Sequence, residues 1–506
     1  MSIFSRIKKV FGEKERPGDI LLPQTPVKSE EISLAFGGSE DFVLRDISLG
    51  GGDKKVKIAF LDGVVSGIYV SDQIIRPITD PVRFGSVASE KEALSLMEQG
   101  VVYGLTALRR KKTAEVIEDL LSGFCCVIFD DLNEAVSFEM RTVEKRSITD
   151  PKEEKVVKGA KDAFIEVLRS NTSLVRRRIK NPALRVKEFT VGRKTATRLS
   201  IMWIEGFTNG EIVAELERRV RKMTVDGALT SSIIEENLSD RPRSIFPQVI
   251  TTERPDKFCM NLLEGRAGLL VDGLPIGYLV PGTFTQFFKV PEDSAHHIAV
   301  STVLTTLRYL SLFVTLLLPA VYVAVSMFHQ EMLPTKLMQS IIDAKQSVPF
   351  PTAVEVLAML IAFELLQEAG LRLPSPIGQT ISIIGALIVG QSAVDAKVVS
   401  PVVVIVVAFA GICGYTVPSQ DMAEALRVCR FLFVLAAIGA GMFGLATASA
   451  LMLYVLCSME SFGVPYMTPF AGTKAKNIKY AFVRKPVVYG DSAECVLKTG
   501  EKNEKV

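Results

Sequence analysis

The stretch Ile377–Asp395, IGQTISIIGALIVGQSAVD, is long enough to cross a membrane as a single helix. Its nineteen residues, at about 1.5 Å each, would extend over roughly 28 Å, the thickness of the hydrocarbon core of a bilayer. On a helical wheel, bulky Ile, Leu and Val side chains gather on one side, with Thr380 and Gln391 among them. The other side is small and partly polar, and its candidates to line a pore are Gln379, Ser382, Gly385, Ala386, Val389, Ser392 and Ala393.

Val389 is the only large apolar residue on this small side of the helix. In an oligomer, a ring of such valines would form a narrow apolar constriction that blocks ions by staying dry. Tight helix packing is the alternative, because it also selects small residues at a spacing of four, here Gly378, Ser382, Ala386 and Gly390. The residues alone leave both interpretations open.

The composition argues against several classes of function. The chain has 506 residues, with 59 Lys and Arg against 56 Asp and Glu, so its overall charge does not indicate a nucleic-acid partner. Its seven cysteines lack metal-ligand spacing and no nucleophile–base constellation is evident, so we expect no metal, no cofactor and no enzymatic activity. Residues 1–12 lack the apolar core of a signal peptide, so we expect the N-terminal half in the cytosol.

An internal repeat runs through residues 41–292. Three pairs of segments match in character at offsets of 142 or 143 residues, and their alternation and β-branched residues are typical of strands. The pairs are Leu44–Gly50 with Val186–Gly192, Lys57–Gly63 with Ser200–Gly206, and Cys126–Asp131 with Gly268–Gly273. Helix-like segments follow from Ser71 and Asn209, both good N-caps, at an offset of only 138. The repeat predicts two copies of one α/β unit, with loops of different length before the helix.

A basic stretch, Arg176–Arg198, contains nine Lys or Arg residues opposed only by Glu188. Contact with anionic lipid headgroups or an acidic partner is one interpretation. We favour the other, a solvated face with ion pairs between subunits. The overlapping segment Asp162–Ile179 is expected to be a helical linker between the two copies.

Apolar runs dominate residues 300–460. Besides Ile377–Asp395, the expected spans are Val303–Phe328, Pro401–Val417 and the glycine-rich Cys429–Cys457, which we expect to be tilted. Arg308 begins the first span and five Lys or Arg residues follow the last, so both ends are predicted to be cytoplasmic. That orientation needs an even number of spans. We favour four, and five with the tail outside is the alternative.

The segment Thr352–Leu371 does not suit lipid alone. Its three intramembrane acidic residues are Glu355, Glu364 and Glu368. Each acid at mid-helix costs about 2.5–3.5 kcal/mol, whereas each of nine Leu, Ile, Phe or Val residues returns only about 0.3–0.6 kcal/mol. We expect the segment to be re-entrant or packed against the bundle. Its acids are functional candidates, and pairing with Arg372 or Lys397 is the structural alternative.

These features predict an α+β membrane protein, in which a duplicated α/β cytoplasmic domain is followed by an α-helical transmembrane bundle. The expected domains are a flexible N-terminal arm (1–40), a first α/β subdomain with the linker helix (41–180), a second α/β subdomain (181–299), the transmembrane helical domain (300–460) and a basic C-terminal tail (461–506).

Long runs of this sequence resemble the A subunits of the GerA-type nutrient germinant receptors of bacterial spores. The resemblance covers nearly the whole chain after residue 40. One departure follows Pro291-Glu292-Asp293, where Ser294-Ala295-His296-His297 stand in place of the aromatic residues usual in the family. The most specific runs are TVGRKTATR (Thr190–Arg198), TERPDK (Thr252–Lys257), LLEGRAGLLVDG (Leu262–Gly273), PFPTAVEVL (Pro349–Leu357), FELLQEAGLRLP (Phe363–Pro374), PIGQTISIIGALIVGQSAV (Pro376–Val394) and SFGVPYMTPF (Ser461–Phe470).

The resemblance implies a cytoplasmic N-terminal domain of two α/β subdomains and a helical domain in the inner membrane of the spore. It implies a transporter-like B subunit and a lipoprotein C subunit as partners. It also implies a homo-oligomeric ring, expected to be pentameric, that conducts ions. The family's nutrient pocket is usually placed on the B subunit, so no ligand-binding residue is assigned here. A scaffold subunit that only relays a signal is the alternative, and the resemblance favours the pore.

Overall fold

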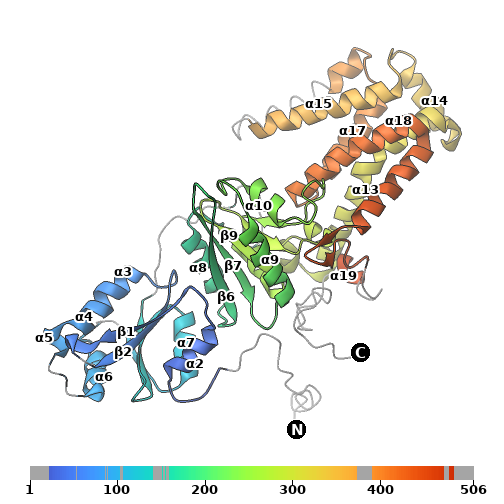
Figure 1. Ribbon diagram of the computed structural model, residues 1–506. Helices are drawn as coiled ribbons and strands as arrows, with labels where there is room; N and C mark the ends of the chain where they lie inside the picture. Colours follow the sequence, from blue (N-terminus) through green and yellow to red (C-terminus); the bar gives the residue numbers. More distant parts are fainter. Residues whose placement is uncertain are drawn as a thin grey trace, which may run out of the picture.

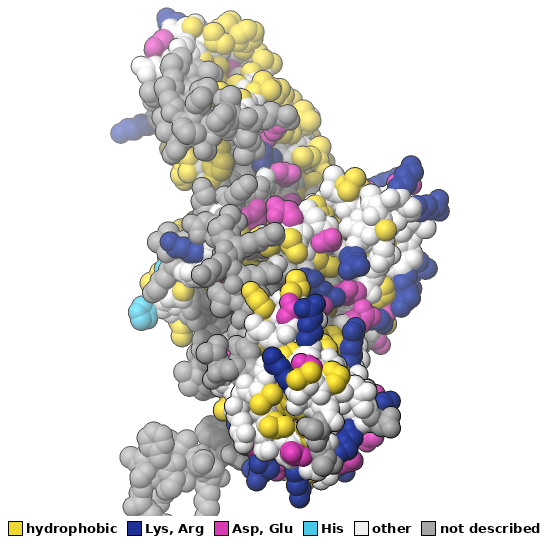
Figure 2. Space-filling view, turned by 90° about the vertical axis from the view of Figure 1, so that its left-hand side faces the viewer, with side chains coloured by type: hydrophobic (Ala, Val, Ile, Leu, Met, Phe, Trp, Pro, Cys, Tyr) yellow, Lys and Arg dark blue, Asp and Glu magenta, His cyan; other side chains and the backbone are white. Residues whose placement is uncertain are grey.

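The computed structural model describes residues 22–52, 54–85, 87, 89–102, 106–140, 151, 154, 159–372, 390–471 and 478–483. Two α/β units follow one another, and a bundle of helices extends from the second (Figure 1). We call them the first unit (residues 22–140), the second unit (159–290) and the helical domain (291–457). Apolar side chains gather over the helical domain, whereas charged side chains are concentrated over the α/β units (Figure 2).

Each α/β unit is built around a five-stranded antiparallel sheet. The strands are β1 (Phe42–Ser48), β2 (Lys55–Leu61), β3 (Ala107–Arg110), β4 (Phe124–Phe129), β5 (Glu134–Glu139), β6 (Leu184–Val191), β7 (Thr197–Ile204), β8 (Ile250–Thr252), β9 (Ala267–Val271) and β10 (Gly277–Val280). The order is β1-β2-β4-β5-β3 in the first sheet and β6-β7-β9-β10-β8 in the second. Strands in matching positions therefore begin 142 or 143 residues apart.

Some of the helices around the two sheets also correspond. They are α2 (Ser29–Phe36), α3 (Gly67–Val70), α4 (Arg76–Thr79), α5 (Pro81–Phe84), α6 (Glu90–Glu98) and α7 (Thr113–Leu121) in the first unit, and α8 (Leu168–Arg178), α9 (Gly210–Lys222), α10 (Ser231–Leu238) and α11 (Pro255–Leu263) in the second. In the first unit α2 packs against α7, and in the second α8 packs against α11.

The first helix after β2 begins earlier than the sequence predicts. α3 begins at Gly67, 143 residues before Gly210 of α9, so these helices share the offset of the strands. A π-helical turn, Ser71–Ile75, continues α3 into α4. The prediction of Ser71 as an N-cap, with loops of different length, is wrong because the backbone of Ser71 is already helical. Asn209 does cap α9, since its side chain accepts a hydrogen bond from the N–H of Glu211 at 3.0 Å.

Part of the predicted flexible arm is folded. Val27, Ile32 and Phe36 are fully buried against α7 and β4, so residues 27–36 belong to the core of the first unit. The predicted linker helix begins at Leu168 rather than Asp162, and Leu168 lies in the core of the second unit. Both segments are mostly polar and place only a few apolar side chains in a core. Their composition therefore indicated an arm and a linker, although both pack as parts of the α/β units.

The basic stretch is held by ion pairs within one chain. Arg176 is 1% exposed and donates to both carboxylate oxygens of Asp41, at 2.9 and 2.8 Å, which joins the second unit to the first. Lys187 pairs with Glu217, and Lys194 with Asp226. The pairs described here lie within one chain, and ion pairs between subunits stay a prediction.

The helical domain contains two helices that are long and apolar enough to cross a membrane, among the described residues. Its helices, followed by a short C-terminal helix, are α12 (Glu292–Ala295), α13 (Ile298–Phe328), α14 (Thr335–Lys345), α15 (Thr352–Arg372), α17 (Pro401–Gly414), α18 (Gln420–Cys457) and α19 (Lys479–Phe482). The two long ones are α13 and α18, and α17 is a shorter apolar helix.

α18 is broken at Ala440 and Gly441, whose backbone angles are not helical. Gly441 lies against Phe328 at the end of α13. Met422 and Leu456, from opposite ends of α18, both belong to the apolar core that the helical domain shares with the second unit. The chain therefore turns back at Gly441, and α18 consists of two antiparallel arms. The prediction of one tilted span at Cys429–Cys457 is wrong, because its glycines also permit a reversal of the chain.

Residues 460–466 pack on the second unit. The sequence predicts the start of a basic tail there. Strands β11 (Glu460–Ser461) and β12 (Val464–Pro465) form a short hairpin. Phe462 and Val464 join the core on one face of the second sheet, and Tyr466 is fully buried. Met459 and Tyr466, on either side of the expected domain boundary at residue 461, belong to one apolar core.

Candidate functional site

The predicted pore helix is described only at its C-terminal end. Residues 390–395 are helical, with Ser392 exposed and Ala393 partly buried against the apolar core of the helical domain. A Cβ placed on Gly390 would lie 3.4 Å from the side chain of Val404 on α17. The other pore-lining candidates, which lie outside the described residues, are Gln379, Ser382, Gly385, Ala386 and Val389.

Glu355 ties α15 to the start of α17. Its carboxylate is 1% exposed and accepts a hydrogen bond from the backbone N–H of Ser400, the residue before α17, at 2.8 Å. An anion at a helix N-terminus is stabilised by the free N–H groups and the helix dipole. The ammonium of Lys345 lies 3.5 Å from the other carboxylate oxygen. These contacts oppose the charge of a buried acid, and Oε1 of Glu355 accepts no hydrogen bond from the described residues.

Glu364 ties α15 to the first arm of α18. Its two oxygens lie 3.0 Å from Arg427 and 3.4 Å from Arg430, and Arg430 is 2% exposed. One turn further along α15, Gln367 donates a hydrogen bond to the hydroxyl of Tyr415 at 2.6 Å. Glu368 lies exposed on the same helix.

The partners of Glu364 were missed by the sequence analysis, which considered Arg372 and Lys397. Arg427 and Arg430 are spaced three apart at the start of an apolar run. Side chains at that spacing share one face of a helix, so the pair could have been read as the partner of an acid on a neighbouring helix. Which helix would supply that acid depends on tertiary packing and has no local signal.

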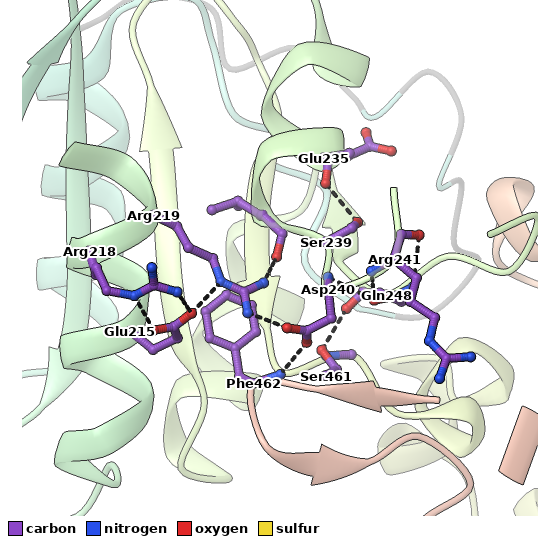
Figure 3. A network of polar contacts seen from close by, with 12 residues as sticks. Glu215, Arg218, Arg219, Glu235, Ser239, Asp240, Arg241, Gln248, Ser461 and Phe462 are labelled. Atoms are coloured by element: carbon purple, nitrogen blue, oxygen red, sulfur yellow. Dashed lines mark hydrogen bonds and ion pairs between the residues drawn. The ribbon is translucent and has the colours of Figure 1, made fainter. Parts of the chain in front are cut away.

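A network of polar contacts joins α9 to the hairpin β11–β12 (Figure 3). Arg219 of α9 pairs with Glu215 at 2.8 Å and also with Asp240. Asp240 accepts a hydrogen bond from the backbone N–H of Phe462 at 2.8 Å, and the guanidinium of Arg219 lies 4.1 Å from the centroid of the Phe462 ring. Hydrogen bonds from Arg218 and Arg219 lower the pKa of Glu215 to about 2. Glu215 is therefore ionised at physiological pH.

Both ends of α18 are hydrogen-bonded to the second unit. At the end of α18, Arg241 donates to the hydroxyl and to the carbonyl oxygen of Ser458, at 3.0 and 2.8 Å. At its start, the hydroxyl of Thr251 donates to Asp421 at 2.9 Å. A displacement of the second unit would therefore act on both arms of α18, whose turn at Gly441 contacts α13.

The described residues contain no cluster of three or more His, Cys, Asp or Glu side chains able to hold a metal ion. Cys125 and Cys126 are fully buried in β4, and burial raises the pKa of Cys126 to about 12. A thiol with so high a pKa is almost never ionised and is a poor nucleophile.

The sequence matches a known family from the first helix of the first unit to beyond the helical domain. Residues 30–492 fit the model of the Bacillus/Clostridium GerA spore germination protein. The chain belongs to the GerA family. Spore germination protein KA of Bacillus subtilis is 36% identical over 475 residues, which cover 94% of this chain and 86% of that protein. The uncharacterized membrane protein YfkQ of Bacillus subtilis is 35% identical over 95% of this chain and 92% of that protein.

Further GerA relatives match over similar lengths. Spore germination protein GerLA of Bacillus cereus is 32% identical over 90% of this chain and 92% of that protein. Among solved structures, the N-terminal domain of the A subunit of the Bacillus megaterium spore germinant receptor GerK3 covers 52% of this chain and 97% of its own, with 27% identity and a TM-score of 0.41. The relative named as a membrane protein, YfkQ, and the two long apolar helices support a membrane-associated protein of this family.

Proposed function

We propose that this chain is the A subunit of a nutrient germinant receptor in the inner membrane of the spore. The observation that carries this proposal is that the GerA match spans the α/β units and the helical domain together. The α/β units would lie in the cytoplasm, and their equal strand orders support an origin by duplication. The partners would be a transporter-like B subunit, a lipoprotein C subunit and further copies of the chain in a ring, expected to be a pentamer.

The proposed activity is the release of ions through a pore lined by Ile377–Asp395, with Val389 as its gate. Val389 is the one bulky apolar residue on a side otherwise made of small and polar residues. An apolar ring excludes ions by dewetting, so trimming the side chain should favour the conducting state. We expect Val389→Ala to leak ions without nutrient, and Ser382→Leu to reduce conduction.

The measurement is ion flux from liposomes that contain the purified chain, with the size of the oligomer determined in parallel. If the segment serves only for packing, Ser382→Leu will break the oligomer and Val389→Ala will cost a few contacts. A Val389→Ala variant that assembles normally with unchanged resting flux would exclude the proposed gate.

A non-conducting relay subunit is the second candidate. The observation that favours it is the attachment of both ends of α18 to the second unit, through Thr251 and Arg241. Such a subunit would pass a conformational change to a partner in the membrane. It predicts no ion flux from the chain alone and a normal germination response with Val389→Ala.

A further inference from the structure

A hollow of about 610 Å³ lies between the second unit and the end of α18. This volume is within the range of about 300–1,000 Å³ that is usual for small-molecule sites. The loop at residues 241–246 forms one wall with Ile245 and Phe246, and Val455 and Met459 form the other. Among the described residues that line the hollow, none is acidic.

Two guanidinium groups accompany these apolar walls. Arg241 is fixed by its two hydrogen bonds to Ser458, and in Figure 3 its guanidinium points away from Asp240. Arg243 is exposed, and no ion pair to it lies within the part of the chain that the structure describes. Guanidinium groups bind phosphate oxygens through two parallel hydrogen bonds, so the pair suits a phosphate group.

The position of the hollow along α18 indicates where the phosphate would come from. The second arm exposes Leu451, Leu453 and Tyr454 by 64%, 52% and 71%, a surface suited to lipid. Tyrosine is enriched where the acyl region of a membrane meets the headgroups. The hollow begins at the next residue, Val455, and so lies at headgroup level if α18 is embedded.

We propose that this hollow binds an anionic phospholipid. The phosphate of the headgroup contacts Arg243 and Arg241, and the glycerol end of an acyl chain lies between Ile245, Val455 and Met459. A free phosphate ion would leave the apolar walls without a partner, whereas a zwitterionic lipid would leave the two arginines without net neutralisation. The inference requires that the helical domain lies in a membrane. It does not require that the chain conducts ions.

The test places a fluorescent reporter in the hollow of the full chain. Ile245→Trp is made in a Trp203→Phe background, which leaves one tryptophan, and the protein is reconstituted in phosphatidylcholine vesicles. A minor fraction of brominated phosphatidylglycerol or brominated phosphatidylcholine then serves as the quencher. We expect stronger quenching by the brominated phosphatidylglycerol. Adding Arg243→Gln should lower this preference about fivefold, whereas Arg76→Gln on α4 should leave it unchanged.

Tyr454→Trp in the same background distinguishes a site from a general surface attraction. This side chain lies on the outer surface beside the hollow, so it should show no preference for the anionic lipid. Equal preference at both positions, or none at Ile245→Trp, would overturn the proposal. Loss of the preference on adding inorganic phosphate would assign the site to the free ion. Absence of quenching by either lipid would show that protein covers the hollow.

A second measurement does not depend on the tryptophan variants. Native mass spectrometry of the unaltered chain, extracted in mild detergent, should show bound phosphatidylglycerol that is reduced about fivefold by Arg243→Gln. Arg243 has no ion pair within the described residues, so its replacement is expected to leave the fold intact. Equal lipid binding by both proteins would contradict the proposal even if the tryptophan variants fail to fold.

Discussion

Glu235 on α10 faces the acidic start of α18. Burial raises its pKa and the carboxylates of Asp421, Glu236 and Glu424 raise it further, whereas a hydrogen bond from Ser231 lowers it. A carboxyl group with a raised pKa stabilises the fold while it is protonated, and this contribution is lost as the pH rises through its folded-state pKa. We therefore expect Glu235→Gln to raise the melting temperature at neutral pH. Below the pKa of a free glutamate the variant and the parent should melt together.

The control for this prediction is Glu118→Gln on α7. Its side chain is exposed on the first unit, so removing its charge should change the melting temperature little at either pH. Thermal unfolding of the solubilised chain, followed by the fluorescence of Trp203, measures both variants. Equal stabilisation by the two substitutions would show that burial at position 235 is not the cause.

For single residues, charged side chains in apolar surroundings could be identified from the sequence, but their partners could not. Glu355 and Glu364 were noticed because a charge in an apolar helix has a cost that can be estimated from the sequence alone. The contacts that compensate it, from Ser400 and from Arg427 and Arg430, come from helices 45 to 66 residues away. Such pairings depend on how the helices pack and leave no local pattern.

At the scale of elements, the turn inside α18 depends on one glycine. Gly441 has a φ of +58°, and a Cβ there would lie 3.0 Å from the ring of His329. We expect Gly441→Ala to destabilise the protein by about 1–3 kcal/mol, because a residue with a side chain is strained in this conformation. Gly439→Ala is the matched control, since a Cβ at that position meets no atom within 4 Å. It should be neutral or slightly stabilising in thermal unfolding. Equal stability of the two variants would indicate that α18 is continuous.

The elements that the sequence predicted best are those with local periodicity. The strands on either side of Gly63 and Gly206 were recognised from alternation and from their near-constant offset. The helix α2 was missed because only Ile32 and Phe36, with the shielded Ser29, are buried in an otherwise polar segment. Its counterpart α8 was recognised as a helix but assigned to a linker. If α2 is matched with α8, the proposed duplication includes one more helix at its N-terminal end.

For the whole molecule, the contacts around Asp240 decide whether the α/β units and the helical domain move together. Asp240 holds the hairpin that follows α18 through the N–H of Phe462, and holds α9 through Arg219. Asp240→Ala removes both contacts. Because a hydrogen bond to a charged group contributes about 1.5–3 kcal/mol, the amide of Phe462 should exchange with deuterium at least about tenfold faster.

Asp226→Asn is the control for Asp240→Ala. The side chain of Asp226 is 65% exposed and that of its ion-pair partner Lys194 is 76% exposed, so this ion pair should contribute little to stability. If the chain relays a signal between its domains, spores carrying Asp240→Ala should germinate more slowly with nutrient, while the protein still assembles. Faster exchange at Phe462 with an unchanged germination response would mean that the hairpin does not carry the signal. The relay would then run through the start of α18, where Thr251 holds Asp421, and Thr251→Val would be the substitution that slows germination.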